Sequence, residues 1–70
     1  MTLPSDVSNE RVVAALVRAG FSIREGGKHT VAWKGSTQVS VPRHRRLKQG
    51  TVRAIVRQAG LTNEQFLALL

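Results

Sequence analysis

The 70-residue sequence contains no cysteine and only four acidic residues, and each shortage excludes a class of structure or chemistry. Without cysteine, neither a disulfide nor a thiolate metal site can stabilise the fold. No apolar run approaches the roughly 20 residues that a membrane-spanning helix needs, and no charged-then-apolar signal opens the sequence. We therefore expect a soluble cytoplasmic protein that has no membrane partner.

The chain is long enough for one domain with a thin core. A domain of this size buries only about 60–65% of the surface that its unfolded chain exposes. Good packing, or a partner that covers the protein, must therefore supply much of its stability. Residues 1–7 include Pro4 and Ser5 and show no periodicity. We expect a loose N-terminal tail over residues 1–7 and a single domain over residues 8–70.

The scarcity of acids is strongest in the middle of the chain. Eleven Lys and Arg face four acids, for a net charge of +7, and residues 26–63 contain no acid. A field of one sign favours a polyanionic partner, above all nucleic acid. An anionic membrane is a weaker candidate, because the densest group of Arg lies in a predicted loop and not on an amphipathic helix. A solvated basic face without any partner is the simpler alternative.

Residues 8–42 predict a helix followed by three short strands. Ser8 is suited to cap the helix and Gly20 to end it, and the apolar stripe between them is Val12, Val13, Leu16 and Val17. Alternation or β-branched content predicts strands over residues 21–24, 29–34 and 37–41. Glycine turns at 26–27 and 35–36 join them, and Pro42 ends the last strand. The result is an antiparallel meander.

Residues 43–70 predict a basic loop and two helices. The loop covers residues 43–48, and the next helix runs from Gly50 or Thr51 to Gln58. Thr62 and Gln65 have the spacing of a capping box that opens a short last helix. The order α-β-β-β-α-α predicts an α+β fold, with a three-stranded antiparallel sheet and two helices on one face.

The stretch from Gly26 to Trp33 contains the strongest catalytic candidate, His29. RNA can be cut through its own 2′-hydroxyl, so an enzyme needs only a base, charge stabilisation and in-line geometry. Imidazole titrates near neutrality, and neighbouring cations such as Lys28 could stabilise charge on the phosphorane. Strand alternation also allows a half-buried structural histidine on the same face as Val31 and Trp33. We expect Trp33 to be a core residue rather than a platform for a base.

A metal-dependent mechanism is poorly supported by the residues. Two-metal nucleases rely on clustered carboxylates, and the four acids here are scattered along the chain. A zinc pair of His29 and His44 would lack further ligands. We therefore predict no metal and no cofactor. His44 itself fits a second acid/base group, a phosphate contact or an ordinary loop histidine.

Several short motifs occur in an order that resembles one known family. They are Ala19-Gly20-Phe21, Gly27-Lys28-His29, Val39-Ser40-Val41-Pro42-Arg43-His44, Leu47-Lys48-Gln49-Gly50-Thr51 and Gln58-Ala59-Gly60-Leu61. Over roughly residues 8–65 the sequence resembles the HicA family of bacterial toxins from toxin–antitoxin pairs. Many members have a second His where Thr30 stands, and an aromatic where Ala32 stands.

The resemblance implies a fold, an activity and a partner. The fold would be like a double-stranded-RNA-binding domain, and the activity would be cleavage of mRNA by a toxin with His29 as the catalytic residue. A HicB-type antitoxin would cover the active surface. The expected RNA- or phosphate-binding residues are Lys28, Arg43, His44, Arg45, Arg46 and Lys48. Two alternatives stay open: a non-catalytic RNA-binding module of the same fold, and an adaptor whose basic face docks an acidic protein.

Overall fold

Two tight turns fold the middle of the chain into one antiparallel sheet. The computed structural model describes residues 3–70 and orders the strands β1 (Ser22–Glu25), β2 (His29–Lys34) and β3 (Thr37–Pro42) side by side. In β1 and β2, Ser22 lies opposite Trp33, whereas His29 in β2 lies opposite Pro42 in β3. The bounds of β2 are as predicted, and β1 lies one residue later than expected.

Each helix has a local reason to begin and end where it does. Helix α1 (Asn9–Arg18) is capped by the Ser8 hydroxyl, which accepts from the Arg11 amide at 3.2 Å, and Gly20 follows it with φ 97°. Helix α2 (Gln49–Ala59) ends at Gly60, in the left-handed region at φ 74°. Helix α3 (Asn63–Leu69) opens with the predicted capping box of Thr62 and Gln65. Serine and threonine caps satisfy amides that have no partner within the helix.

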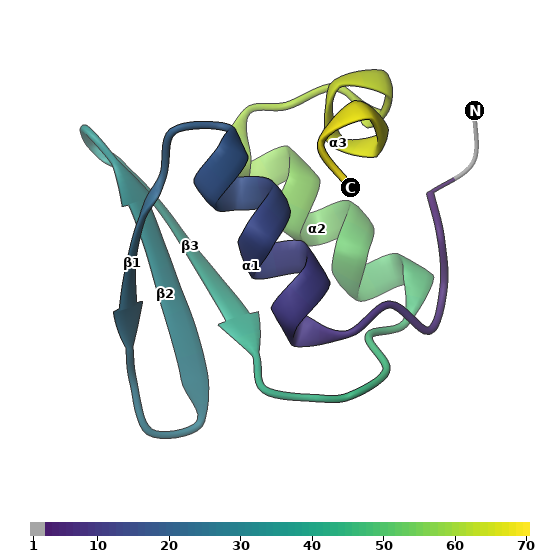
Figure 1. Cartoon of the computed structure of the whole chain (residues 1–70), viewed down its shortest axis with the longest axis horizontal. Coiled ribbons are helices and arrows are strands. Elements are labelled where there is room, and N and C mark those ends of the chain that lie inside the picture. The colour runs from purple at the N-terminus through teal and green to yellow at the C-terminus, as the bar shows by residue number, and fades with distance from the viewer. Residues whose placement is uncertain (1–2) are drawn as a thin grey trace.

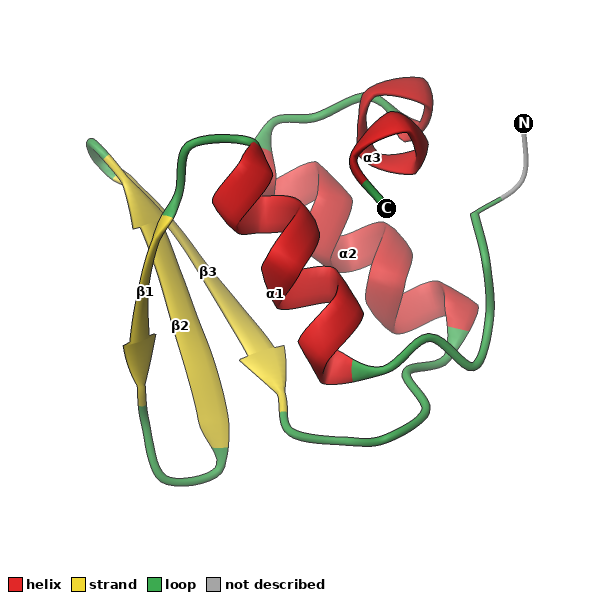
Figure 2. Cartoon of the chain, viewed as in Figure 1, coloured by secondary structure: helices red, strands yellow, loops and turns green. Residues whose placement is uncertain are grey.

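The helices cover one face of the sheet and leave the other face open. Helices α1 and α2 both pack against the sheet, and α3 contacts both of them at the far end (Figure 1). Figure 2 shows the resulting two layers, strands on one side and helices on the other. The predicted α+β fold, with its α-β-β-β-α-α order, is confirmed.

The core lies between these two layers. Alternate residues of the strands point into it, including Thr30 and Ala32 of β2 and Val39 and Val41 of β3. Helix α1 contributes its own inward stripe, and Phe66 of α3 is fully buried at the far end. Burial of these side chains is the main stabilising contribution to such a domain. The buried hydrophobic residues are Leu3, Val7, Val12, Ala15, Leu16, Phe21, Ala32, Val39, Val41, Leu47, Val52, Ile55, Val56 and Phe66.

The prediction of a core role for Trp33 is wrong. Trp33 is four residues after His29 in β2, so both side chains lie on the face of the sheet that points away from the helices. Trp33 is 40% exposed. The inward position next to it is filled by Ala32, which is fully buried. Val17, predicted in the stripe of α1, is also 51% exposed, and Ala15 takes its place among the buried residues.

The prediction of a loose tail over residues 1–7 is wrong for the part that the structure describes, while residues 1–2 lie outside it. Leu3 and Val7 are buried at 4% and 3% exposure. Val7 forms an antiparallel bridge with Leu47, and the Gln49 side-chain amide donates to the Leu3 carbonyl at 2.7 Å. The segment therefore packs against the loop before α2 and completes that end of the core.

Candidate functional site

The turn between β1 and β2 sets the backbone position of His29. The Gly26 amide donates to the His29 carbonyl at 2.9 Å, which closes the hairpin. A Cβ atom at residue 26 would lie 2.6 Å from that carbonyl oxygen, closer than atoms can pack. Gly27, the glycine of the predicted Gly-x-His motif, has open space around it. The tight contact that requires glycine is therefore at Gly26, one residue before the motif.

The side chain of His29 faces solvent on the open face of the sheet. It is the first residue of β2 and it is exposed, whereas Thr30 beside it points into the core and is 2% exposed. The alternative of a half-buried structural histidine is therefore wrong. An exposed imidazole is accessible to a ligand and can exchange a proton with it.

The basic loop, residues 43–48, is fixed to the sheet and to α1 by its backbone. The Arg43 amide donates to the Lys28 carbonyl at 3.3 Å, which joins the loop to the turn before His29. Asn9, the first residue of α1, donates its amide to the His44 carbonyl at 3.1 Å and its side chain to the Pro42 carbonyl at 3.0 Å. Leu47 is buried and anchors the far end of the loop. These contacts hold the polar side chains of the loop outward.

Every residue predicted to bind phosphate is exposed, but one of them already has a partner. The Arg43 guanidinium forms an ion pair with the Glu25 carboxylate at the end of β1. Arg45 and Arg46 are exposed in the loop, and Lys48 stands immediately before α2. An anion that binds there would have to share Arg43 with Glu25.

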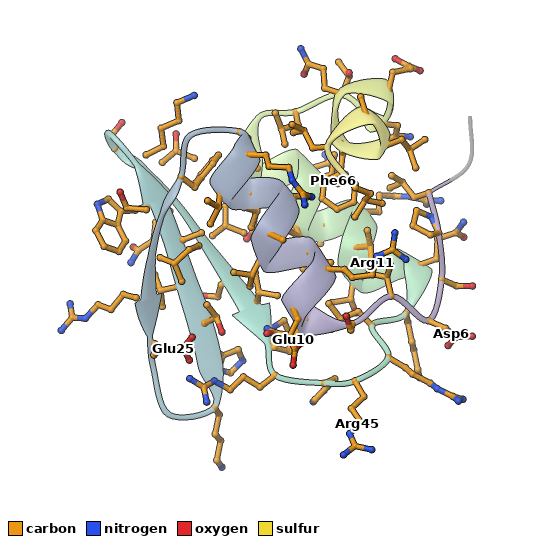
Figure 3. The ribbon with its side chains drawn as sticks, in the orientation of Figure 1. Asp6, Glu10, Arg11, Glu25, Arg45 and Phe66 are labelled. Atoms are coloured by element: carbon orange, nitrogen blue, oxygen red, sulfur yellow. The ribbon has the colours of Figure 1, made fainter. Side chains whose placement is uncertain are left out.

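A hollow of about 310 Å³ lies between the loop and the start of α1. It is lined by Ser8, Asn9, Glu10, Glu25, Arg43, His44 and Arg45. Figure 3 shows Glu10 at the start of α1, Glu25 on the neighbouring sheet edge and Arg45 extending below the loop. The hollow thus brings Arg43, His44 and Arg45 together with two carboxylates, whereas His29, Lys28, Arg46 and Lys48 are not among its lining residues.

Two other basic side chains hold the structure together at the opposite end. The Lys34 ammonium donates to the Ala19 carbonyl at 3.0 Å, at the end of α1. Arg18 donates to the Leu69 carbonyl at 2.6 Å and ties α1 to α3. Cations are stabilised at a helix C-terminus by the helix dipole. From its charge alone, Lys34 could contact a phosphate or belong to a solvated basic face. In the structure its ammonium group instead donates to the Ala19 carbonyl.

Sequence reasoning missed the roles of Asn9 and Glu25. The sequence marks Glu25 only as one of four acids, and Asn9 only as a residue near the helix start. Strand register can suggest the pairing of Glu25 with Arg43. Glu25 stands directly before the glycine turn and Arg43 directly after the third strand, and these two strands flank β2. Nothing in the sequence indicated that Asn9 would reach Pro42.

Two other classes of site are absent from the part of the chain that the structure describes. Within residues 3–70, no group of three or more His, Cys, Asp or Glu side chains is arranged to hold a metal ion. In the same range, no helix has the length and apolar character needed to cross a membrane.

Comparison with known proteins identifies one family. A family model described as the HicA toxin of bacterial toxin–antitoxin systems matches residues 10–61, which is more than half of the chain. No curated protein matches the chain. The match covers α1 from its second residue, the whole sheet, the basic loop and α2.

Proposed function

The chain belongs to the HicA toxin family of bacterial toxin–antitoxin systems, and we propose that it is a metal-independent endoribonuclease that cuts mRNA with His29 as general acid or base. The observation that carries the proposal is the placement of His29, exposed on a fixed strand end beside the Lys28 turn and the basic loop. Family membership already provides the toxin role and an antitoxin partner.

The chemistry needs few groups, and this end of the sheet offers them. The 2′-hydroxyl of RNA attacks the adjacent phosphate once a base removes its proton, and an acid protonates the leaving 5′-oxygen. His29 can serve in one of these two steps, and a water molecule can accept or supply the proton in the other. Lys28, next to His29, and the guanidinium groups of the basic loop would stabilise the charge that develops on the phosphorane. These cations lie in a stretch of sequence without acids, and in the structure Arg43 is paired with Glu25 from outside that stretch.

The decisive experiment measures single-turnover RNA cleavage in excess chelator with three proteins. The wild type should cut, His29→Ala should lose cleavage, and His44→Ala should bind RNA more weakly yet still cut when RNA is saturating. Because His29 is exposed, its replacement should change the free energy of unfolding by no more than about 0.5 kcal/mol. Wild-type cleavage rates in folded His29→Ala would refute the catalytic assignment.

The runner-up is a non-catalytic RNA-binding module of the same fold. It predicts RNA binding by the wild type and by His29→Ala alike, with no cleavage in either. The same experiment therefore separates the two functions. A protein that only docks acidic proteins through its charge would bind polyglutamate or heparin as well as it binds RNA.

We also propose that a HicB-type antitoxin covers the active surface. A basic surface that binds RNA must be blocked until the toxin is needed, and an acidic partner would bind there with favourable charge complementarity. Co-expression with the product of the neighbouring gene should give a complex that lacks RNase activity and melts at a higher temperature, because the partner binds only the folded toxin. Recovery from the native host as a free, abundant and harmless monomer would favour the RNA-binding module.

A further inference from the structure

The open face of the sheet carries a tryptophan in line with His29. Trp33 and Val17 are the large hydrophobic side chains that stand exposed in residues 3–70, and Val17 lies on α1. Trp33 and His29 belong to the same strand and are four residues apart, so both project from the same face. At the ordinary rise of a strand they are separated by about 13 Å. A flat aromatic ring thus faces solvent a short distance along the sheet from His29.

The residues around Trp33 are polar and carry no negative charge. Ser22 of β1 and Gln38 of β3 lie directly opposite Trp33 in the register, and both are exposed. Arg24 lies opposite Val31, between Trp33 and His29. Glu25 alternates to the helix side of the sheet, opposite the buried Thr30. This open face of the sheet, called the outer face from here on, consists of Ser22, Arg24, His29, Val31, Trp33, Gln38, Ser40 and Pro42.

This set of groups matches the chemistry of unpaired RNA. A nucleobase freed from a duplex can stack on an aromatic ring, while neighbouring hydroxyl and amide groups hydrogen-bond its edge. The phosphate that follows the base needs a cation, and Arg24 lies on the path to His29. A base inside a duplex is already stacked on both faces and cannot use the ring, so only the two end pairs of a duplex could reach it. The outer face therefore favours a single strand over a helix.

We propose that the outer face holds single-stranded RNA, with one nucleobase stacked on Trp33 and the backbone passing Arg24 to reach His29. The proposal rests on the proposed function, since His29 marks where the phosphate to be cut would lie. To the proposed function it adds single-stranded RNA as the substrate class and Trp33 as a binding residue. The basic loop would then hold the phosphate at His29 and the backbone beyond it, and the outer face would distinguish an unpaired target from a paired one.

Trp33 is the one tryptophan of the sequence, so its fluorescence reports on this face directly. The probe is a short RNA oligonucleotide with 2′-O-methyl groups, which lacks the attacking hydroxyl and cannot be cut by that route. Titration into the wild-type protein should quench the fluorescence, and a blunt duplex of the same sequence should quench it much less. Polyglutamate, which offers charge without bases, should not quench it.

Substitution provides the second arm of the test, with affinity measured by the anisotropy of a labelled oligonucleotide because the Trp33 variants contain no tryptophan. Trp33→Ala should weaken binding of the single strand about fivefold to a hundredfold, the usual range when one stacking partner of a base is removed, and Trp33→Phe should weaken it less. Val17→Ala removes an exposed apolar side chain from α1 and should leave the affinity unchanged. Circular dichroism of each variant verifies that it folds, and Trp33→Phe keeps the test valid if Trp33→Ala does not fold.

The outcomes separate this inference from the proposed function. Quenching by the modified single strand, combined with no cleavage of ordinary RNA, would support the stacking site and refute the nuclease. Cleavage of ordinary RNA with unchanged KM and affinity in Trp33→Ala would refute the stacking site alone. Equal quenching by the duplex, or by polyglutamate, would also refute it.

Discussion

Glu25 and Arg43 form an ion pair that connects the two strands flanking β2, on the helix side of the sheet. Glu25 is the last residue of β1, and Arg43 directly follows β3. Both side chains are well exposed, at 70% for Glu25 and 41% for Arg43. The pair therefore restrains one cation of the basic loop without contributing much to stability. A polyanion that binds this end of the protein competes with Glu25 for Arg43.

Glu25→Gln should strengthen RNA binding while leaving the fold almost as stable as before. An exposed pair contributes no more than about 1 kcal/mol, so the free energy of unfolding should fall by less than that. Release of Arg43 to a phosphate should steepen the slope of log affinity against log salt by about 0.7–0.9. Glu64→Gln makes the same charge change on α3, and an equal gain there would show that only net charge matters.

Gly26→Ala should disturb the site, whereas Gly27→Ala should not. The new Cβ at residue 26 would collide with the His29 carbonyl, so the turn must move, at a cost of about 1–3 kcal/mol in the free energy of unfolding. Residue 27 has open space, and alanine there should be neutral or stabilise by about 0.4–1 kcal/mol. Denaturant unfolding and RNA cleavage measure both effects. Similar behaviour of the two variants would contradict the collision.

The double variant Arg45→Ala with Arg46→Ala should reduce the salt dependence of RNA binding. Removal of one arginine–phosphate ion pair should lower the slope of log affinity against log salt by about 0.7–0.9 in magnitude. The matched control is Arg53→Ala with Arg57→Ala, which removes the same charge from the exposed side of α2. If the two double variants weaken RNA binding equally, the positive charges of the protein act as a diffuse field and the basic loop has no special role.

Leu3→Ala should destabilise the protein by about 2–4 kcal/mol, which is the usual effect of truncating a buried leucine. Ser5→Ala, in the same segment but exposed, should change the free energy of unfolding by less than about 0.5 kcal/mol. Urea unfolding of the two variants makes the comparison. Equal stabilities would mean that the segment does not pack in solution as the structure shows.

The order of elements could be predicted from the sequence because local signals mark it. Ser8, Gly20 and Gly60 have the required cap geometries, and the turns lie at the glycines. Which side of a strand faces the core is a different question. Alternation in β2 defines two faces, and only the packing of α1 and α2 decides that Ala32, and not Trp33, is covered.

The sequence predicts candidate residues for the site, which stay predictions, but it did not predict their contacts. His29 and the basic loop stand out in the sequence by residue type and charge. The pairing of Arg43 with Glu25 and the anchoring of the loop by Asn9 join residues far apart in the chain. Such contacts depend on tertiary placement, which composition and periodicity do not encode. The same holds for Leu3 and Val7, two apolar residues without a period that are buried against Leu47.

The bridge between Val7 and Leu47 has a consequence for folding kinetics. Helix α1 and all three strands lie within the stretch of chain that this contact closes. Closing so long a loop carries an entropic penalty that shorter hairpins avoid, so local pairs form sooner. We expect the sheet and α1 to assemble first and residues 3–7 to dock last. On a ribosome this docking must wait until Leu47 has emerged, so residues 3–7 are made well before their partner is available.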